Sequence, residues 1–237
     1  MQFYLFKESC ATKETGPEYP QVQKWKTGYD DDKHDSYYSY YYASSKGRIF
    51  PDFIPDLDAL VMQNRAKPTD LISSGLSIGF IISDKLKAII QQFKFPPYRL
   101  YPVKILHKKV ELDGYYFMHI ISDYFHDYLE FVDYCQSTFS IAKIDRSNAK
   151  PISLTSKQDY LNKAKELQDD FSIRKSILRR IYAEKICFNK DFANGLDCFI
   201  APFGIDYYIS QDFKNVLIED KITGCNIQAT DRILIKS

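Results

Sequence analysis

The middle of the chain constrains the fold more than any other part. Ser83 stands before apolar residues that recur at helical spacing, which predicts an N-capped helix over residues 83–93. Pro96-Pro97 ends this helix, because proline lacks the N–H that a helix interior needs. Two long apolar runs, 100–112 and 115–121, follow in direct succession. A helix followed by two adjoining strands is typical of sheets in which sequence neighbours pair.

Asp113-Gly114 separates the two apolar runs, and both residues tolerate the positive φ of a two-residue hairpin turn. The sequence therefore predicts a β-hairpin that turns at this dipeptide. Further strand patterns occupy shorter segments: 3–6, 22–25, 131–141, 184–188, 198–203, 226–229 and 233–235. Because strands outnumber helices and short turns join most of them, we expect an α+β fold. It should contain largely antiparallel sheets and about three to four amphipathic helices, not a wound α/β sheet.

Three more helices are predicted in the second half of the chain. One begins at Ser156, and apolar spacing over residues 173–182 predicts a further short helix. The last is expected to open at Ser210 and to end near Gly224, a residue that suits a helix C-terminus. A solvated helix face is the simplest interpretation of four basic residues: Arg174, Lys175, Arg179 and Arg180.

Residues 82–90 align without a gap on residues 209–217. Each segment combines the end of a strand, a serine and an amphipathic helix. A duplicated unit would produce this match, and so would the general pattern of capped helices, which is the simpler explanation. Two copies are too few for a solenoid.

The first seventy residues differ from the rest, so we divide the chain into an N-terminal strand and loop segment rich in Tyr and Asp, 1–70, and an α+β core, 71–237. Residues 30–35 contain four aspartates. This cluster can be a solvated loop, a docking patch for a basic partner or a cation site. Tyrosines crowd residues 37–42, where they can pack in the core or bind a partner. The expected partner-binding residues are Asp30, Asp31, Asp32, Asp35, Tyr37, Tyr38, Tyr40 and Tyr41.

Composition excludes several classes of function. The chain has 32 Lys and Arg against 31 Asp and Glu, a net charge of +1, which gives no global electrostatic case for nucleic acid. No apolar run approaches the roughly 18 residues of a membrane span, and the start of the chain lacks a signal-peptide pattern. The cysteines are odd in number and scattered, as in a reducing compartment, so we expect a cytoplasmic protein.

Candidate catalytic patterns are weak. Ser77 lies in a Gly-x-Ser-x-Gly pattern, but a strand-like run follows it where a nucleophile elbow needs a helix. His119 and His126 have acidic neighbours (Asp123, Asp127 and Glu130) but no metal-ligand spacing. No glycine-rich phosphate loop is present. We therefore predict no catalytic residue, no metal and no cofactor.

Several phrases, taken in order, carry a family resemblance. They are Ile82-Ser83 before Leu86-Lys87, Phe95-Pro96 before Leu100-Tyr101-Pro102-Val103, Tyr115 to Ile120, Gly195 to Phe199, and Ile209-Ser210 through Lys214 to Ile222-Thr223-Gly224. Over roughly residues 75–230 the chain resembles a family of bacterial polymorphic-toxin immunity proteins, formerly catalogued as a domain of unknown function. The resemblance implies a cytoplasmic protein that binds and neutralises a cognate protein toxin. It supplies no catalytic residues.

Two main hypotheses follow. The first is a non-enzymatic binding protein that occludes the active domain of a toxin, with no nucleic acid or membrane as partner. The alternative is a small serine- or histidine-dependent hydrolase, for which Ser77 is the candidate nucleophile.

Overall fold

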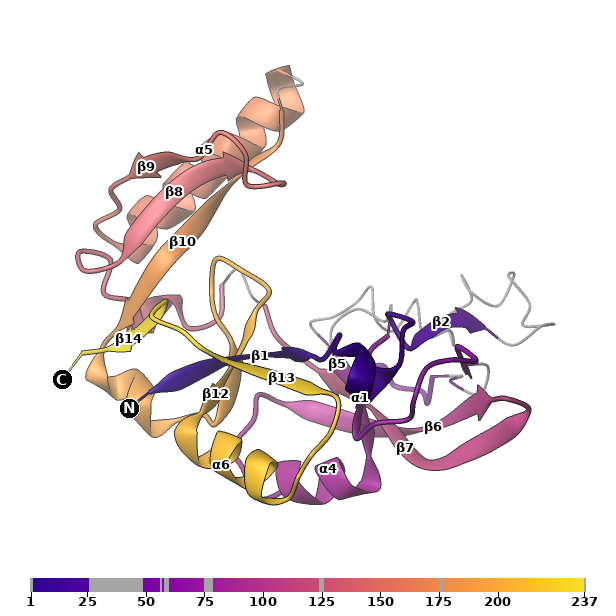
Figure 1. Ribbon diagram of the computed structural model, residues 1–237. Helices are drawn as coiled ribbons and strands as arrows, with labels where there is room; N and C mark the ends of the chain where they lie inside the picture. Colours follow the sequence, from indigo (N-terminus) through magenta and orange to yellow (C-terminus); the bar gives the residue numbers. More distant parts are fainter. Residues whose placement is uncertain are drawn as a thin grey trace. The chain divides into compact units, whose positions relative to one another are not determined.

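The fold is α+β with mostly antiparallel sheets, as the sequence predicted. Figure 1 shows the computed structural model. It describes residues 2–25, 49–55, 57, 60–74, 79–123, 126–174 and 177–236.

The chain divides into two compact units, each built from separate stretches of sequence. The first unit comprises Met1–Leu5, Tyr124–Gln211 and Ala229–Ser237, and the second comprises Phe6–Asp123 and Asp212–Gln228.

The second unit is built on a six-stranded sheet with the strand order β2-β3-β6-β7-β5-β4. Its strands are β2 (Val22–Trp25), β3 (Leu60–Met62), β4 (Leu71–Ile72), β5 (Gly79–Ser83), β6 (Tyr98–His107) and β7 (Val110–Ile120). Buried residues such as Leu60, Ile81 and Phe117 form its core. Strands β2 and β3 precede residue 70 but belong to the same sheet as the strands that follow it. Neither unit therefore ends at the predicted division between residues 70 and 71.

The predicted hairpin exists, but the predicted turn was wrong. Strands β6 and β7 turn at Lys108-Lys109, where both residues have positive φ (51° and 69°). Asp113-Gly114 instead lies inside β7, opposite the point where the register of the pair shifts. Gly114 uses its positive φ of 74° in this bulge. Because the chain turns at Lys108-Lys109, three more residue pairs form between β6 and β7 beyond the bulge, including Ile105 opposite Leu112.

Helices of the second unit follow the predicted caps. Helix α4 (Asp84–Ile90) begins directly after β5, and the Leu86 N–H donates to Ser83 Oγ at 3.2 Å, which confirms the N-cap. The remaining elements of this unit are α1 (Thr12–Thr15), α6 (Gln211–Glu219) and β13 (Cys225–Ala229). The Phe213 ring of α6 packs edge-on against Phe93 and Phe95.

The first unit contains a sheet with the order β14-β10-β8-β9. The helices and strands of this unit are η1 (Leu129–Phe131), β8 (Thr138–Lys143), β9 (Lys150–Ile152), α5 (Lys157–Arg174), β10 (Arg179–Phe188), η2 (Lys190–Asn194), β11 (Cys198–Ile200), β12 (Tyr207–Ser210) and β14 (Ile233–Ile235). The core is aromatic: Phe192 stacks on Phe188 with ring centres 4.0 Å apart and meets Phe199 edge-on.

The prediction of a further helix over residues 173–182 was wrong. Helix α5 ends at Arg174 and β10 begins at Arg179. Residues four apart share a face in a helix and also in a strand, so the apolar spacing could not separate the two. Arg179 and Arg180 therefore lie on a strand and not on the polar side of a helix.

The match between residues 82–90 and 209–217 extends beyond capped helices. In the first copy, Ser83 donates its N–H to the Asp70 carbonyl and its hydroxyl to Asp70 Oδ1, both at 2.8 Å. In the second copy, Ser210 makes the same two bonds to Asp197, again at 2.8 Å and with the same separation of 13 residues. Helix capping does not require an aspartate at that distance, so the unit is repeated.

The two copies also share their strand pairing. Leu71 pairs with Ile82 between β4 and β5, as Cys198 pairs with Ile209 between β11 and β12. The strand order is β4-β5-β7-β6 in the first copy and β11-β12-β1-β13 in the second. Strand β1 (Phe3–Glu8) therefore occupies the place that β7 holds in the first copy. The boundary between the two units falls within β1.

Candidate functional site

The residues predicted to bind a partner lie outside the described part of the chain. They are Asp30, Asp31, Asp32, Asp35, Tyr37, Tyr38, Tyr40 and Tyr41. Ser77 of the Gly-x-Ser-x-Gly pattern lies outside it as well. The docking patch and the hydrolase alternative both stay predictions.

The two histidines considered together belong to different units. His119 lies on β7 in the second unit, where its ring is 1% exposed, and His126 lies in the first unit. Within the described ranges, no three His, Cys, Asp or Glu side chains gather closely enough to hold a metal ion.

Helix α5 of the first unit carries the most distinctive surface. Its start is fixed by a reciprocal cap: the Asp159 N–H donates to Ser156 Oγ at 3.1 Å, and the Thr155 N–H donates to Asp159 Oδ2 at 3.0 Å. Tyr160 is buried and meets Phe203 edge-on at 4.8 Å between ring centres. Beyond this anchor, Leu161, Ala164 and Leu167 are partly buried against the core, and Phe171 is 43% exposed.

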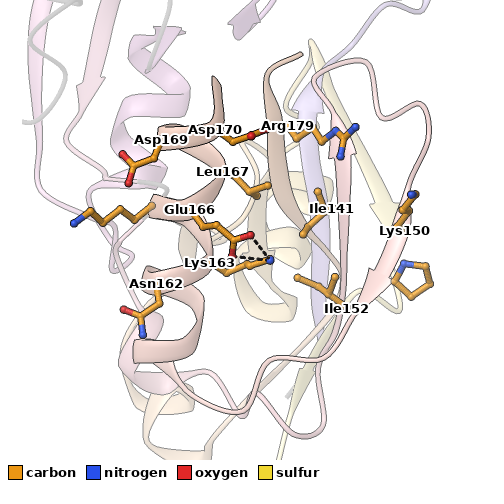
Figure 2. A pocket seen from close by; sticks show the side chains of 12 residues that line it. Ile141, Lys150, Ile152, Asn162, Lys163, Glu166, Leu167, Asp169, Asp170 and Arg179 are labelled. Carbon is orange, nitrogen blue, oxygen red and sulfur yellow. Dashed lines mark hydrogen bonds and ion pairs between the residues drawn. The ribbon is translucent and has the colours of Figure 1, made fainter. Parts of the chain in front are cut away.

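A groove of about 860 Å³ separates one side of α5 from strands β8 and β9. Figure 2 shows Ile141 and Ile152 on the strands and Leu167 on the helix, which give the groove an apolar floor. Lys163 Nζ and Glu166, three residues apart on α5, form an ion pair within the helix at 2.7 Å. The other polar lining residues are Lys150, Asn162, Lys165, Asp169, Asp170 and Arg179. We call this the α5 groove.

A second hollow of about 450 Å³ lies between α5 and the start of β10. Leu167 and Phe171 of α5 line it together with Leu178 and Ile181. A third hollow, of about 210 Å³, is lined by Ile144, Arg146, Arg180, Ile181, Tyr182, Phe203, Gly204 and Ile205. We call these the α5–β10 hollow and the Tyr182 hollow. No Asp or Glu is among the described residues that line either of them.

Arginines give these two hollows their charge. Arg179 and Arg180 line the α5–β10 hollow, and Arg146 lies with its guanidinium 4.8 Å from the centre of the Tyr182 ring in the other. Arginine forms paired hydrogen bonds with carboxylates, and apolar walls gain about 25 cal/mol per Å² on burial. The arrangement is therefore chemically suited to binding an apolar surface that carries acidic groups.

The sequence predicted the helix α5 but not how much of its apolar face would stay exposed. The apolar spacing from Tyr160 to Phe171 indicates a helix face that packs on a core. In the structure only the first turn of that face is deeply buried, and Phe171 remains exposed. Five charged residues of α5 line the α5 groove, namely Lys163, Lys165, Glu166, Asp169 and Asp170, and the amide side chain of Asn162 lines it as well.

No helix within the described residues is long and apolar enough to cross a membrane. A scan against models of known protein families finds no match to this chain, and a search of the curated proteins finds no match either.

Proposed function

We propose that this protein is a non-enzymatic binding protein of the bacterial cytoplasm that neutralises a cognate toxin by covering its active domain. The observation that supports this most directly is the surface of α5. An 18-residue helix is anchored through Tyr160 and flanked by two hollows, a groove of about 860 Å³ with an apolar floor and charged walls and a hollow of about 450 Å³ with apolar walls. The sequence resemblance spans roughly residues 75–230, and the phrases that carry it lie on either side of this helix.

The size of the surface suits a protein partner. A stable complex buries roughly 800 Å² on each side and depends on a few anchor residues. Phe171 and Leu178 offer apolar anchors, and the arginines beside them offer partners for carboxylates. Because those arginines lie at the rim, added salt should slow association more than it speeds dissociation.

The test is capture of the protein encoded by a neighbouring toxin gene. Phe171→Asp should weaken that complex about thirtyfold, the effect of losing an anchor worth about 2 kcal/mol. Ile218→Asp is the matched control, because Ile218 is a 59% exposed apolar residue on the other exposed helix face, in α6. Its complex should form with unchanged affinity. Unchanged affinity of the Phe171 variant, or no complex with any neighbour-encoded protein, would overturn the proposal.

A further inference from the structure

The first half of β10 forms an open sheet edge. On one side, Arg179 to Ala183 pair with β8. On the other side, β14 reaches only Ile186 to Phe188, as Figure 1 shows at the end of this long strand. Along the described chain, no strand pairs with residues 179–182 on that second side. An open edge presents unpaired N–H and C=O groups to an extended chain.

The position of Pro151 shows which backbone groups point outward. Pro151 of β9 pairs with Ser140 and has no N–H, so β9 bonds with Phe139 and Ile141 on β8. In an antiparallel ladder, the residues between these point the other way. Ser140 and Ala142 therefore face β10.

The same alternation continues on β10. Tyr182 and Arg180 pair with Ser140 and Ala142, so their backbone groups face β8. The N–H and C=O groups of Arg179 and Ile181 consequently point to the open edge. Ala183 follows in this series, and its carbonyl accepts a hydrogen bond at 3.1 Å from Arg232 Nη2. The edge is thus closed at Ala183 and open before it.

Hollows flank this edge. Arg180 and Ile181 line both the α5–β10 hollow and the Tyr182 hollow. Successive side chains of a strand point to opposite faces. A strand added beside β10 would therefore place one side chain toward Phe171 and the next toward Tyr182.

The charge and the apolar side chains around the edge indicate which kind of molecule binds there. Arg146, Arg179 and Arg180 surround the edge, and no acidic residue lines the two hollows within the described chain. Exposed apolar side chains lie among them, with Ile144 55% and Ile205 72% exposed. A phosphate backbone would contact the arginines but would neither cover these apolar groups nor pair with the backbone edge. An extended peptide uses all three.

We propose that the open edge of β10 binds an extended segment of the partner protein, with apolar residues at its centre and acidic residues at its ends. This proposal rests on the proposed function and names the part of the toxin that docks. Backbone bonds to Arg179 and Ile181 would provide affinity, and the two hollows would provide specificity.

The first test measures binding of a labelled seven-residue peptide with three central apolar residues and two acidic residues at each end. Arg179→Pro removes an outward N–H without breaking the ladder to β8, and should weaken binding about threefold to tenfold beyond Arg179→Gln. Arg179→Gln removes only the charge, and should weaken binding about threefold and reduce its salt dependence. A peptide with lysines in place of the acidic residues should not bind.

Amide exchange of the wild-type protein provides a second test that needs no variant. Peptide binding should slow exchange of the Arg179 and Ile181 amides and leave that of Arg180 and Tyr182, which already face β8, unchanged. No binding, or slowing at all four amides alike, would overturn the proposal. So would binding of an RNA oligonucleotide or an anionic vesicle that Arg179→Gln abolishes while the peptide stays unbound.

The two proposals fail in different ways. If the neighbour-encoded toxin binds and Phe171→Asp releases it, but Arg179→Pro retains full affinity, the strand proposal is wrong and the toxin-binding proposal stands. If no neighbour-encoded protein binds while the peptide does, the edge is a peptide site and the toxin-binding proposal is wrong.

Discussion

The repeated unit occurs twice in this chain, and the two copies differ in where the third strand comes from. In the first copy, β7 follows the strand pair and the helix in sequence and forms a hairpin with β6. In the second copy, β1 takes this place although the pair it joins begins nearly at the other end of the sequence. The hydroxyl of Tyr4 on β1 bonds to Gln211, 207 residues away. The same local design is thus completed by a local strand in one copy and a distant strand in the other.

The two equivalent strands also carry ionisable residues of opposite kind. Burial raises the pKa of Glu8, on β1, to about 7, although it accepts hydrogen bonds from the Ser74 N–H and Tyr19. Burial lowers the pKa of His119, on β7, with a smaller contribution from Arg99. Each strand therefore favours the neutral form of its residue.

Removing β1 should have the largest effect. Deletion of residues 2–8 removes Phe3 and Phe6, each worth about 3–5 kcal/mol when truncated in a core. We expect the amides of β12 to lose their protection from hydrogen exchange while those of β5 keep theirs. A synthetic peptide of residues 1–9 should restore protection. If β12 stays protected without β1, the two copies do not depend on their third strands as described.

Glu8→Gln should give the next largest effect. A raised pKa means that the stability supplied by neutral Glu8 is present below pH 4.5 and is lost as pH rises to about 7. Glutamine stays neutral, so the variant should be more stable at pH 8 by up to about 3 kcal/mol and similar to wild type at pH 4. Chemical denaturation at both pH values measures this. An equal effect at the two pH values would contradict it.

His119→Phe should show the opposite pH dependence. The two ring nitrogens of His119 have no hydrogen-bond partner among the described residues, and the rings of Phe50, Phe117 and Tyr101 surround it. A lowered pKa means that stability is present above pH 6.5 and is lost as pH falls below it. We expect a gain of about 1–3 kcal/mol that is larger at pH 5 than at pH 8. A loss of stability at pH 5 would refute this account.

Substitution of Asp70, which belongs to the first copy, should change the stability of the protein by a smaller amount. Burial raises its pKa, but hydrogen bonds from Thr223 and Ser83 outweigh this and hold the pKa below its usual value. Its contribution is therefore present above about pH 4 and is lost as pH falls. For this half-exposed group we expect Asp70→Asn to cost about 1–2 kcal/mol at pH 7.

A double-mutant cycle checks the origin of that loss. The Thr223 N–H and hydroxyl donate to Asp70 Oδ2 at 2.9 and 2.8 Å. Thr223→Val should be destabilising alone and have little further effect when combined with Asp70→Asn. Additive losses would mean that the two residues act independently.

Local signals in the sequence were sufficient for part of the fold. The cap at Ser83 and the start of α5 after Ser156 were predictable, because each depends on residues close in sequence. The hairpin turn was not, because Lys108-Lys109 has no marked turn preference while Asp113-Gly114 does.

Non-local pairing explains what the sequence did not show. The position of β1 beside β12 depends on contacts across most of the chain, which no local pattern records. The same holds for the candidate site. The apolar spacing of α5 predicts a helix face, but which turns of that face are covered depends on the strands opposite them.

The place of β1 has a consequence for synthesis of the chain. Ribosomes release β1 long before its sheet neighbours β12 and β13, which come about two hundred residues later. A strand with apolar residues such as Phe3 and Phe6 must therefore wait through most of translation before it can pair, and closing so long a loop slows folding. Fragments that stop before residue 207 leave this strand without its partner, and unpaired apolar strands are what chaperones hold and proteases cut.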